Sequence, residues 1–197
     1  MRNIICFRYG DYYGPEYIKV LKKQLKNYNV IVLGDGEDAD IKESPMYQME
    51  GFWYEMRIFA PDLKKYQPFL YLDIDSFIMD EIDEVFDKKE RLIPLEWNPG
   101  ARNKYIFTLA WLTYTDDIWE EWYSDRQLWM DTYHTSQDFI SRFNFNSFQE
   151  EMPGFVGSYK RHNRLEPVNK IIAFHGVPKM PQAKGWAQDR WLRYVKD

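Results

Sequence analysis

The stretch FLYLDID, residues 69–75, limits the possible folds more than any other part of the sequence. Four apolar residues, Phe69 to Leu72, favour a dry core, and two carboxylates, Asp73 and Asp75, follow them with one residue between. Because burying an unpaired carboxylate is costly, a metal, a partner or water must offset that cost. In open α/β sheets, ligands bind beyond the carboxyl ends of the strands. The stretch therefore favours an α/β sheet with a ligand site where this strand ends.

The first 34 residues have the pattern of a βαβ unit. NIICFRY, residues 3–9, predicts a strand, and Pro15 is suited to the first position of a helix because its missing N–H is not needed there. VIVLG, residues 30–34, predicts the second strand. Between them, apolar residues recur at helical spacing at Ile18, Leu21, Leu25 and Tyr28. A βαβ opening is typical of α/β proteins, and we expect one α/β domain over residues 1–197 with a mixed, mostly parallel central sheet.

The rest of the chain alternates expected helices and strands. Helices are expected in GFWYEMRIFAPDL up to Pro61, and in IDEVFD (82–87), DDIWEEWYSDRQLWM (116–130), SQDFISRF (136–143) and AQDRWLRYV (187–195). Strands are expected in FLYL (69–72), RLIPL (91–95), KYIFTLAWL (104–112) and KIIAFHG (170–176). DGEDADIKESP, residues 35–45, is polar and is expected to be a loop.

Charge and cysteine content exclude several classes of partner. The formal net charge is -5, and no dense basic stripe is present, so nucleic acid is not expected as a partner. The single cysteine, Cys6, lies in an apolar run and is expected to be a buried core residue of a cytoplasmic protein. The longest uncharged apolar stretch is too short to cross a bilayer, and we expect neither a transmembrane segment nor a signal peptide.

The two acids after the apolar run predict a metal site. Side chains alternate along a strand, so Asp73 and Asp75 are expected on one face, roughly 7 Å apart along the backbone. Hard oxygen donors suit Mg²⁺ or Mn²⁺, and a cation makes buried negative charge tolerable. An Asp-x-Asp pattern by itself is weak, because three residues recur by chance and a solvated turn at a strand end is the ordinary alternative.

Several segments together resemble glycosyltransferases with the type A nucleotide-sugar-binding fold, in the glycogenin-like and related phage and bacterial branches. Members of that group typically read YLD-x-D, a short apolar stretch and then LDELF. The resemblance runs from about residue 2 to about residue 186, and the most specific segments are LYLDID and FHGVPK. It is carried by RYGDYYGPEYIKVL (8–21), YLDIDSFIMDEIDEVF (71–86), SQDFI (136–140), FVGSYKRHN (155–163) and IIAFHGVPKMP (171–181).

This resemblance implies a Rossmann-like nucleotide-diphospho-sugar transferase domain that moves a sugar from a UDP- or GDP-sugar to a hydroxyl of a glycan or other acceptor. It implies that Asp73 and Asp75 contact the metal, that Asp73 also contacts the donor ribose, and that His175 completes the metal site. Because imidazole accepts Mn²⁺ better than Mg²⁺, Mn²⁺ is the expected cofactor and Mg²⁺ the alternative. His134 and His162 lie in no such setting and are expected to be structural or surface residues.

The resemblance also assigns residues to the donor and to the transferred sugar. Tyr9, Gly10, Asp11 and Tyr12 follow the first strand, where this fold holds the base; Tyr12 or Tyr13 is expected to stack on it and Asp11 to accept a hydrogen bond from it. Gly176 is expected to let the backbone approach the diphosphate, Lys179 to neutralise it, and Arg57 to be a further donor contact. Asp138 or Gln137 is expected to line the sugar side as the catalytic group, with retention at the anomeric carbon.

Departures from the family pattern leave two alternatives open. Where relatives often carry Lys in GWW-x-K-L, this chain has Glu55, and YIFTLAWL replaces a common Asn-Ser pair, leaving Thr108 as the nearest polar residue. These departures motivate a non-catalytic member of the fold that binds a nucleotide sugar or carbohydrate. The second alternative is a haloacid-dehalogenase-type phosphatase with Asp73 as nucleophile. That motif belongs on a first strand, whereas about 70 residues precede it here.

Overall fold

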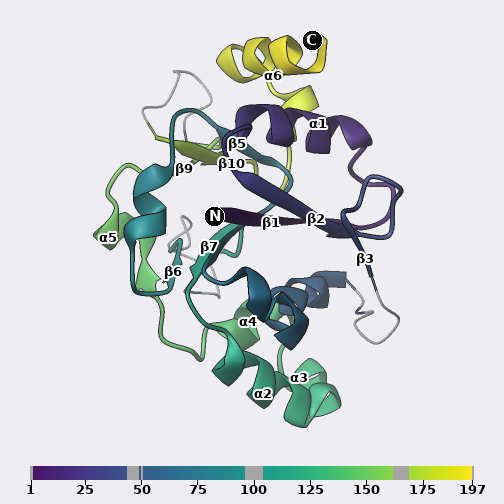
Figure 1. Cartoon of the computed structure of the whole chain (residues 1–197), viewed down its shortest axis with the longest axis vertical. Coiled ribbons are helices and arrows are strands. Elements are labelled where there is room, and N and C mark those ends of the chain that lie inside the picture. The colour runs from purple at the N-terminus through teal and green to yellow at the C-terminus, as the bar shows by residue number, and fades with distance from the viewer. Residues whose placement is uncertain (1, 44–48, 50, 96–103, 162–168, 197) are drawn as a thin grey trace.

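The structure is a computed structural model that describes residues 2–43, 49, 51–95, 104–161 and 169–196 (Figure 1). The strands are β1 (Asn3–Arg8), β2 (Asn29–Gly34), β3 (Ile41–Lys42), β4 (Phe69–Leu72), β5 (Ser76–Ile78), β6 (Leu92–Ile93), β7 (Leu109–Leu112), β8 (Asn146–Ser147), β9 (Val156–Ser158) and β10 (Ile171–Ala173). The α-helices are α1 (Pro15–Gln24), α2 (Asp116–Ser124), α3 (Arg126–Thr132), α4 (Ser136–Ile140), α5 (Phe148–Glu151) and α6 (Trp186–Lys196). The 3-10 helices are η2 (Gly51–Phe59), η3 (Pro61–Tyr66), η4 (Asp83–Asp87) and η5 (Met180–Gln182).

The main sheet has seven strands in the order β3-β2-β1-β4-β7-β6-β8, and β5, β10 and β9 form a smaller sheet. In the main sheet only β7 runs antiparallel to its two neighbours, so the sheet is mixed and mostly parallel, as the sequence predicts. From β1 the chain moves outward to β2 and β3, and then returns to place β4 on the other side of β1. The carboxyl ends of β1 and β4 therefore meet at a topological switch point, where open α/β sheets bind ligands.

Both faces of the main sheet are buried. Successive side chains of a strand point to opposite faces, so each strand contributes residues to both. In β1, Ile4 and Cys6 belong to the hydrophobic cluster that includes α1 and α6, whereas Ile5 and Phe7 belong to the cluster that includes η2, α2 and α4. Figure 1 shows this layering, with α1 and α6 on one side of the strands and α2, α3 and α4 on the other. The near-continuous apolar runs in the sequence are the consequence of this burial on both faces.

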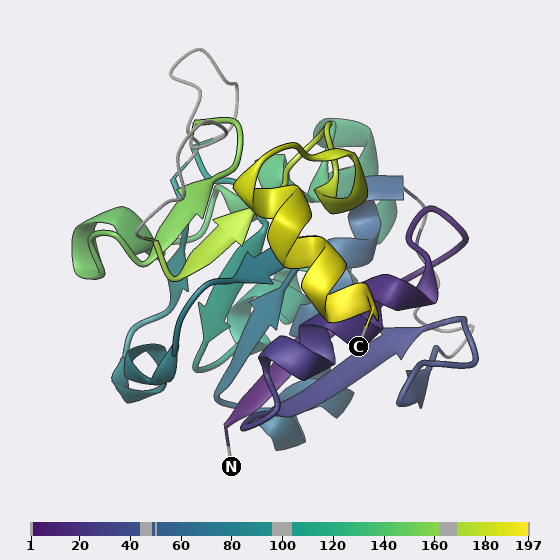
Figure 2. The ribbon, with the colours of Figure 1, turned by 90° about the horizontal axis from the view of Figure 1, so that it is seen from above.

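Helix α6 packs against α1, as Figures 1 and 2 both show. The Tyr17 and Trp191 rings lie 5.0 Å apart between centroids. The ammonium groups of Lys19 and Lys23 donate to the carbonyls of Val195 and Tyr194, at 3.3 and 2.9 Å. These bonds satisfy carbonyls in the last turn of α6 that have no partner within the helix. The C-terminal segment is thereby fixed onto the first βαβ unit.

Some expected elements differ in detail from the structure. The helix expected over 116–130 is two helices, because Asp125 adopts φ -158 and ψ 77 and its side chain accepts a hydrogen bond from the Leu128 N–H, which starts α3. The helix expected before Pro61 is the 3-10 helix η2. The expected loop 35–45 contains the two-residue strand β3.

Two further sequence expectations concern Cys6 and the membrane. Cys6 is fully buried, and burial raises the pKa of its thiol to about 12, so it is a core residue with no thiolate character. None of the helices in the described ranges is long and apolar enough to span a bilayer.

Candidate functional site

Asp73 and Asp75 lie on a β-turn that joins β4 to β5. The Ser76 N–H donates to the Asp73 carbonyl at 2.9 Å, which closes the turn, and the Asp73 N–H donates to the Thr108 carbonyl at 2.8 Å. The apolar strand ends at Leu72, so the strand alternation expected for the two acids does not apply to them. The tight turn, rather than a shared strand face, keeps both carboxyl groups at the end of β4.

Asp75 joins three distant parts of the chain. Its side chain is 2% exposed. Its Oδ2 accepts a hydrogen bond from the Tyr13 hydroxyl at 2.8 Å and forms an ion pair with the Lys179 ammonium. The same ammonium donates to the Phe174 carbonyl at 3.1 Å and lies 5.3 Å from the centroid of the Tyr13 ring. The loop after β1, the acidic turn after β4 and the segment after β10 therefore meet at one carboxylate.

The ionised form of Asp73 is destabilised in this position. Burial, the negative charge of Asp75 and the negative charge of Glu55 raise the pKa of Asp73 well above its usual range, although Tyr71 donates a hydrogen bond to it and Lys179 is nearby. The hydroxyls of Ser76 and Thr108 are buried without a hydrogen-bond partner in the described part of the chain. A divalent cation would relieve the repulsion between the two carboxylates, so their oxygen donors fit such an ion.

His175 lies beside a serine hydroxyl in this structure. Its Nε2 is 2.7 Å from the Ser158 hydroxyl, and within the described ranges no three His, Cys, Asp or Glu side chains are grouped so that they could hold a metal ion. The pairing of β10 with β5 nevertheless brings Ala173 opposite Ser76, so the segment that carries His175 borders the acidic turn. Gly176, the next residue, has φ +68, a conformation that favours glycine.

The four residues expected to contact the nucleotide base of the donor, residues 9–12, lie in the loop after β1. Tyr12 is 69% exposed and packs edge-on against Tyr13, and Asp11 is also exposed. Gly10 has φ +61, and its N–H donates to the Asp35 carboxylate at 3.0 Å. Tyr9 instead stacks on Tyr54 at 4.3 Å and donates its hydroxyl hydrogen bond to Glu43, so only part of this loop faces solvent.

Arg57 is engaged inside the protein. Its side chain is 2% exposed, its Nε donates to Glu43 at 2.9 Å, and its two terminal nitrogens donate to Asp62 at 2.8 and 2.7 Å. These carboxylates hold the pKa of Arg57 above its usual value against the effect of burial. A donor phosphate would have to compete with both acids for this guanidinium.

Gln137 and Asp138 lie at the start of α4 and have different surroundings. Asp138 forms a capping box with Thr135: its carboxylate accepts from the Thr135 N–H at 3.2 Å, and the Thr135 hydroxyl accepts from the Asp138 N–H at 3.3 Å. Gln137 donates to Glu55 at 3.4 Å. The Gln137 amide is therefore directed toward Glu55, whereas the Asp138 carboxylate caps the start of the helix.

Three residues at this site were not among the sequence candidates. Tyr71 lies in β4 two positions before Asp73, and its hydroxyl donates a hydrogen bond to that carboxylate. Ser158 lies on the three-residue strand β9 and gave no signal, because so short an element has no readable period. Glu55 was recognised only as a departure from the family pattern, although its charge acts on Asp73.

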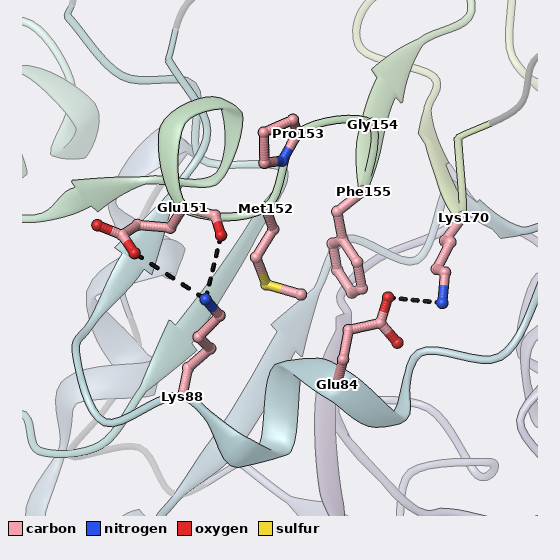
Figure 3. A pocket seen from close by; sticks show the side chains of 8 residues that line it. All are labelled: Glu84, Lys88, Glu151, Met152, Pro153, Gly154, Phe155 and Lys170. Atoms are coloured by element: carbon pink, nitrogen blue, oxygen red, sulfur yellow. Dashed lines mark hydrogen bonds and ion pairs between the residues drawn. The ribbon is translucent and has the colours of Figure 1, made fainter.

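A separate cavity of about 500 Å³ lies away from these residues, where η4 meets the segment before β9 (Figure 3). Met152 and Phe155 point into it, and an ion pair stands on each side, Lys88 with Glu151 and Lys170 with Glu84. Lys170 precedes β10 whereas His175 follows it, so this cavity lies at the opposite end of the smaller sheet from the acidic turn.

Solved structures with a similar fold are glycosyltransferases. GlyE of Streptococcus pneumoniae TIGR4 aligns with 98% of this chain at 14% identity and a TM-score of 0.62, and this chain spans 60% of GlyE. A glycosyltransferase involved in the glycosylation of the major capsid of PBCV-1 aligns with 99% of this chain and 98% of its own length, at 13% identity and a TM-score of 0.57. Mouse xyloside xylosyltransferase 1 aligns with 90% of this chain and 99% of its own length, at 14% identity and a TM-score of 0.51.

No protein-family model matches the chain, and no curated protein matches it. At 13–14% identity, the likeness to solved structures establishes the fold alone, a mixed α/β fold that these glycosyltransferases share. The phosphatase alternative requires the acid pair to follow the first strand of its fold, whereas here the pair follows the fourth strand along the chain. The place of the acid pair in the strand order therefore argues against that alternative.

Proposed function

We propose that this protein is a metal-dependent glycosyltransferase that moves a sugar from a nucleoside diphosphate sugar, a UDP- or GDP-sugar, to a hydroxyl of a glycan or other acceptor. The observation that carries the proposal is the junction at Asp75, where the loop after β1, the acidic turn after β4 and the segment after β10 meet at the switch point of the sheet. In α/β sheets this position binds nucleotides. The fold shared with glycosyltransferases supports the same reading.

Asp73 and Asp75 would hold the cation, Mn²⁺ or alternatively Mg²⁺, which when bound would supply Lewis-acid stabilisation of the leaving diphosphate. His175 remains a candidate third ligand; its Nε2 is hydrogen-bonded to Ser158, and a hydrogen bond at one ring nitrogen is compatible with metal binding at the other. Tyr13 fixes the orientation of Asp75 through its hydroxyl. The mutual repulsion of the two acids supports this assignment, because a site that is strained without a cation gains most from binding one.

The other residues divide between the nucleotide and the sugar. Lys179, whose ammonium balances Asp75, would neutralise negative charge that develops on the diphosphate, and Gly176 would allow the backbone to approach it. Tyr12 and Asp11 are exposed and would contact the base. Gln137 would lie on the sugar side, and we include retention at the anomeric carbon in the proposal on the strength of the glycogenin-like resemblance.

The test is release of nucleotide from a panel of UDP- and GDP-sugars with Mn²⁺, for the wild type, Asp75→Asn and Asp80→Asn. Asp80 is exposed just after β5, so Asp80→Asn makes the same charge change as Asp75→Asn but outside the acidic turn. We expect release that requires Mn²⁺, is lost in Asp75→Asn and persists in Asp80→Asn. Release that is absent, or that survives both EDTA and Asp75→Asn, would contradict the proposal. Tight donor binding without release would favour the non-catalytic alternative.

A further inference from the structure

Glu55 is a carboxylate held in a defined position between η2 and the start of α4. The Ser136 hydroxyl donates to its Oε2 at 2.5 Å, and the Gln137 amide donates to its Oε1 at 3.4 Å. Ser136 is fully buried, so the first of these bonds fixes the carboxyl group on a rigid support. A carboxylate has about four acceptor positions, and these two bonds leave acceptor capacity on both oxygens.

Among the described residues, Glu55 has no cationic partner, unlike several other carboxylates of this protein. Glu43 pairs with Arg57 inside the protein, and Figure 3 shows Glu84 beside Lys170 and Glu151 beside Lys88. Around Glu55, the described residues supply only the neutral donors Ser136 and Gln137. A largely desolvated carboxylate without a cation is costly, because burial removes the water that stabilises its charge. The charge therefore calls for a functional explanation.

The surroundings of Glu55 connect it to the acidic turn. Tyr71 packs in the same hydrophobic cluster as residues of η2 and α4, and its hydroxyl donates a hydrogen bond to Asp73, so this cluster borders the carboxyl end of β4. The negative charge of Glu55 acts on both Tyr71 and Asp73. Although protein packs closely around its carboxyl group, the side chain is partly open to solvent. A ligand that is bound at Asp73 and extends toward α4 would therefore meet this carboxylate next.

We propose that Glu55 is the side chain that accepts a hydrogen bond from a hydroxyl of the transferred sugar, and that Ser136 is a positioning residue which holds it for this contact. The inference rests on the proposed function, because it takes a nucleotide sugar bound at the acidic turn as its starting point. It assigns the donor class as a sugar with a free hydroxyl directed at α4. It also gives the charge of Glu55 a use, since hydrogen bonds to a charged acceptor are stronger than those to a neutral one.

The experiment compares the affinity for a nucleoside diphosphate alone with the affinity for the same nucleotide carrying a sugar. Titration calorimetry with Mn²⁺ would use UDP, UDP-glucose, UDP-galactose, UDP-N-acetylglucosamine, GDP and GDP-mannose. The variants are Glu55→Gln, Glu55→Ala, Ser136→Ala and the charge-matched control Glu84→Gln, which removes an acid from the cavity of Figure 3. The measured quantity is the ratio of the dissociation constant of the nucleotide to that of its sugar derivative.

For the best donor, we expect Glu55→Ala to reduce this ratio by roughly tenfold to hundredfold, the range for a hydrogen bond to a charged group. Any effect of the lost charge on Asp73 changes the affinity for the nucleotide and for its sugar derivative alike, and cancels in the ratio. Glu55→Gln and Ser136→Ala should give smaller losses, and Glu84→Gln none. A purely structural role would weaken the nucleotide and its sugar derivative equally, and that result would overturn the inference.

Three further outcomes are decisive. If the wild type binds neither nucleotides nor their sugars, the proposed function fails and the inference falls with it. If donors bind and the ratio is the same in all Glu55 variants, the inference fails while the proposed function stands. If no sugar on the panel adds affinity to its nucleotide, Glu55 makes no sugar contact and the inference also fails. Should Glu55→Ala not fold, Ser136→Ala and Glu55→Gln give the same comparison.

Discussion

Glu55 and Arg57 lie two positions apart on η2 and differ in how the burial of their charge is compensated. The Arg57 guanidinium is balanced by Glu43 and Asp62, so its burial is compensated by geometry that satisfies most of its donors. Glu55 has only neutral hydrogen-bond donors, and desolvation raises its pKa to about 7. Arg57 links η2 to the preceding loop, whereas the burial of Glu55 carries a cost that its two hydrogen bonds offset only in part.

The raised pKa of Glu55 predicts how stability depends on pH. The ordinary pKa is 4.5 and the folded value about 7, so between these two values the folded protein holds a proton that the unfolded chain has lost. Stability from this group therefore falls as pH rises through that window, and the full penalty is present above it. Glu55→Gln removes the penalty, and we expect the variant to be more stable than wild type by up to about 3 kcal/mol at pH 8 and equal to it near pH 4.

Urea unfolding at several pH values measures this difference, with Glu84→Gln as the control. Glu84 pairs with Lys170 at 2.5 Å, and both side chains are partly exposed, so its substitution should change stability by less than about 1 kcal/mol without the same rise between pH 4 and 8. A Glu55→Gln variant that is less stable than wild type at pH 8 would show that the carboxylate stabilises the fold. That would also weaken the case for a functional charge.

At the scale of single elements, the start of α4 separates a structural from a chemical role for Asp138. Its carboxylate caps the helix together with Thr135. We expect Asp138→Ala to lower stability by about 1 kcal/mol, the usual cost of losing a cap, and Asp138→Asn to lower it less, because the amide oxygen can still accept from the Thr135 N–H. Thermal unfolding and nucleotide release should be measured on both variants. If Asp138→Asn keeps its stability and loses release, Asp138 acts in the transfer itself, and the helix-cap explanation is insufficient.

The elements that the sequence predicts well are those in which the spacing of apolar residues follows directly from which faces are buried. β1 and β4 are apolar runs because both of their faces are covered, and α1 shows the period of one buried face. The break at Asp125 could not be read in this way, because an apolar helical pattern continues across it and only the local cap reveals the boundary. The 3-10 form of η2 has the same apolar residues as an α-helix would have, so its period gave the type of element only approximately.

At the scale of the whole molecule, the sequence predicts which segments lie together but not which partner each side chain contacts. Asp73, Asp75, Lys179 and His175 were expected together, and the fold brings their segments to one edge of the two sheets. Which group each one contacts depends on neighbours that pattern alone does not reveal: Tyr13 and Lys179 share Asp75, and Ser158 takes His175. Long-range pairing of short strands such as β9 and β10 decides these contacts, and three-residue strands have too few positions to specify a register in sequence.

Because the site joins segments from both ends of the chain, ligand binding should stabilise the whole fold. A ligand that binds only the folded state at one hundred times its dissociation constant adds about 2.7 kcal/mol, which for a chain of this size raises Tm by roughly 5–10 °C. We expect UDP or GDP with Mn²⁺ to produce this shift in a thermal scan of the wild type and of Asp80→Asn, but not of Asp75→Asn. A shift that persists in Asp75→Asn would place the nucleotide elsewhere on the molecule. A shift without any need for Mn²⁺ would mean that Lys179, already paired with Asp75, supplies the only positive charge that the diphosphate requires.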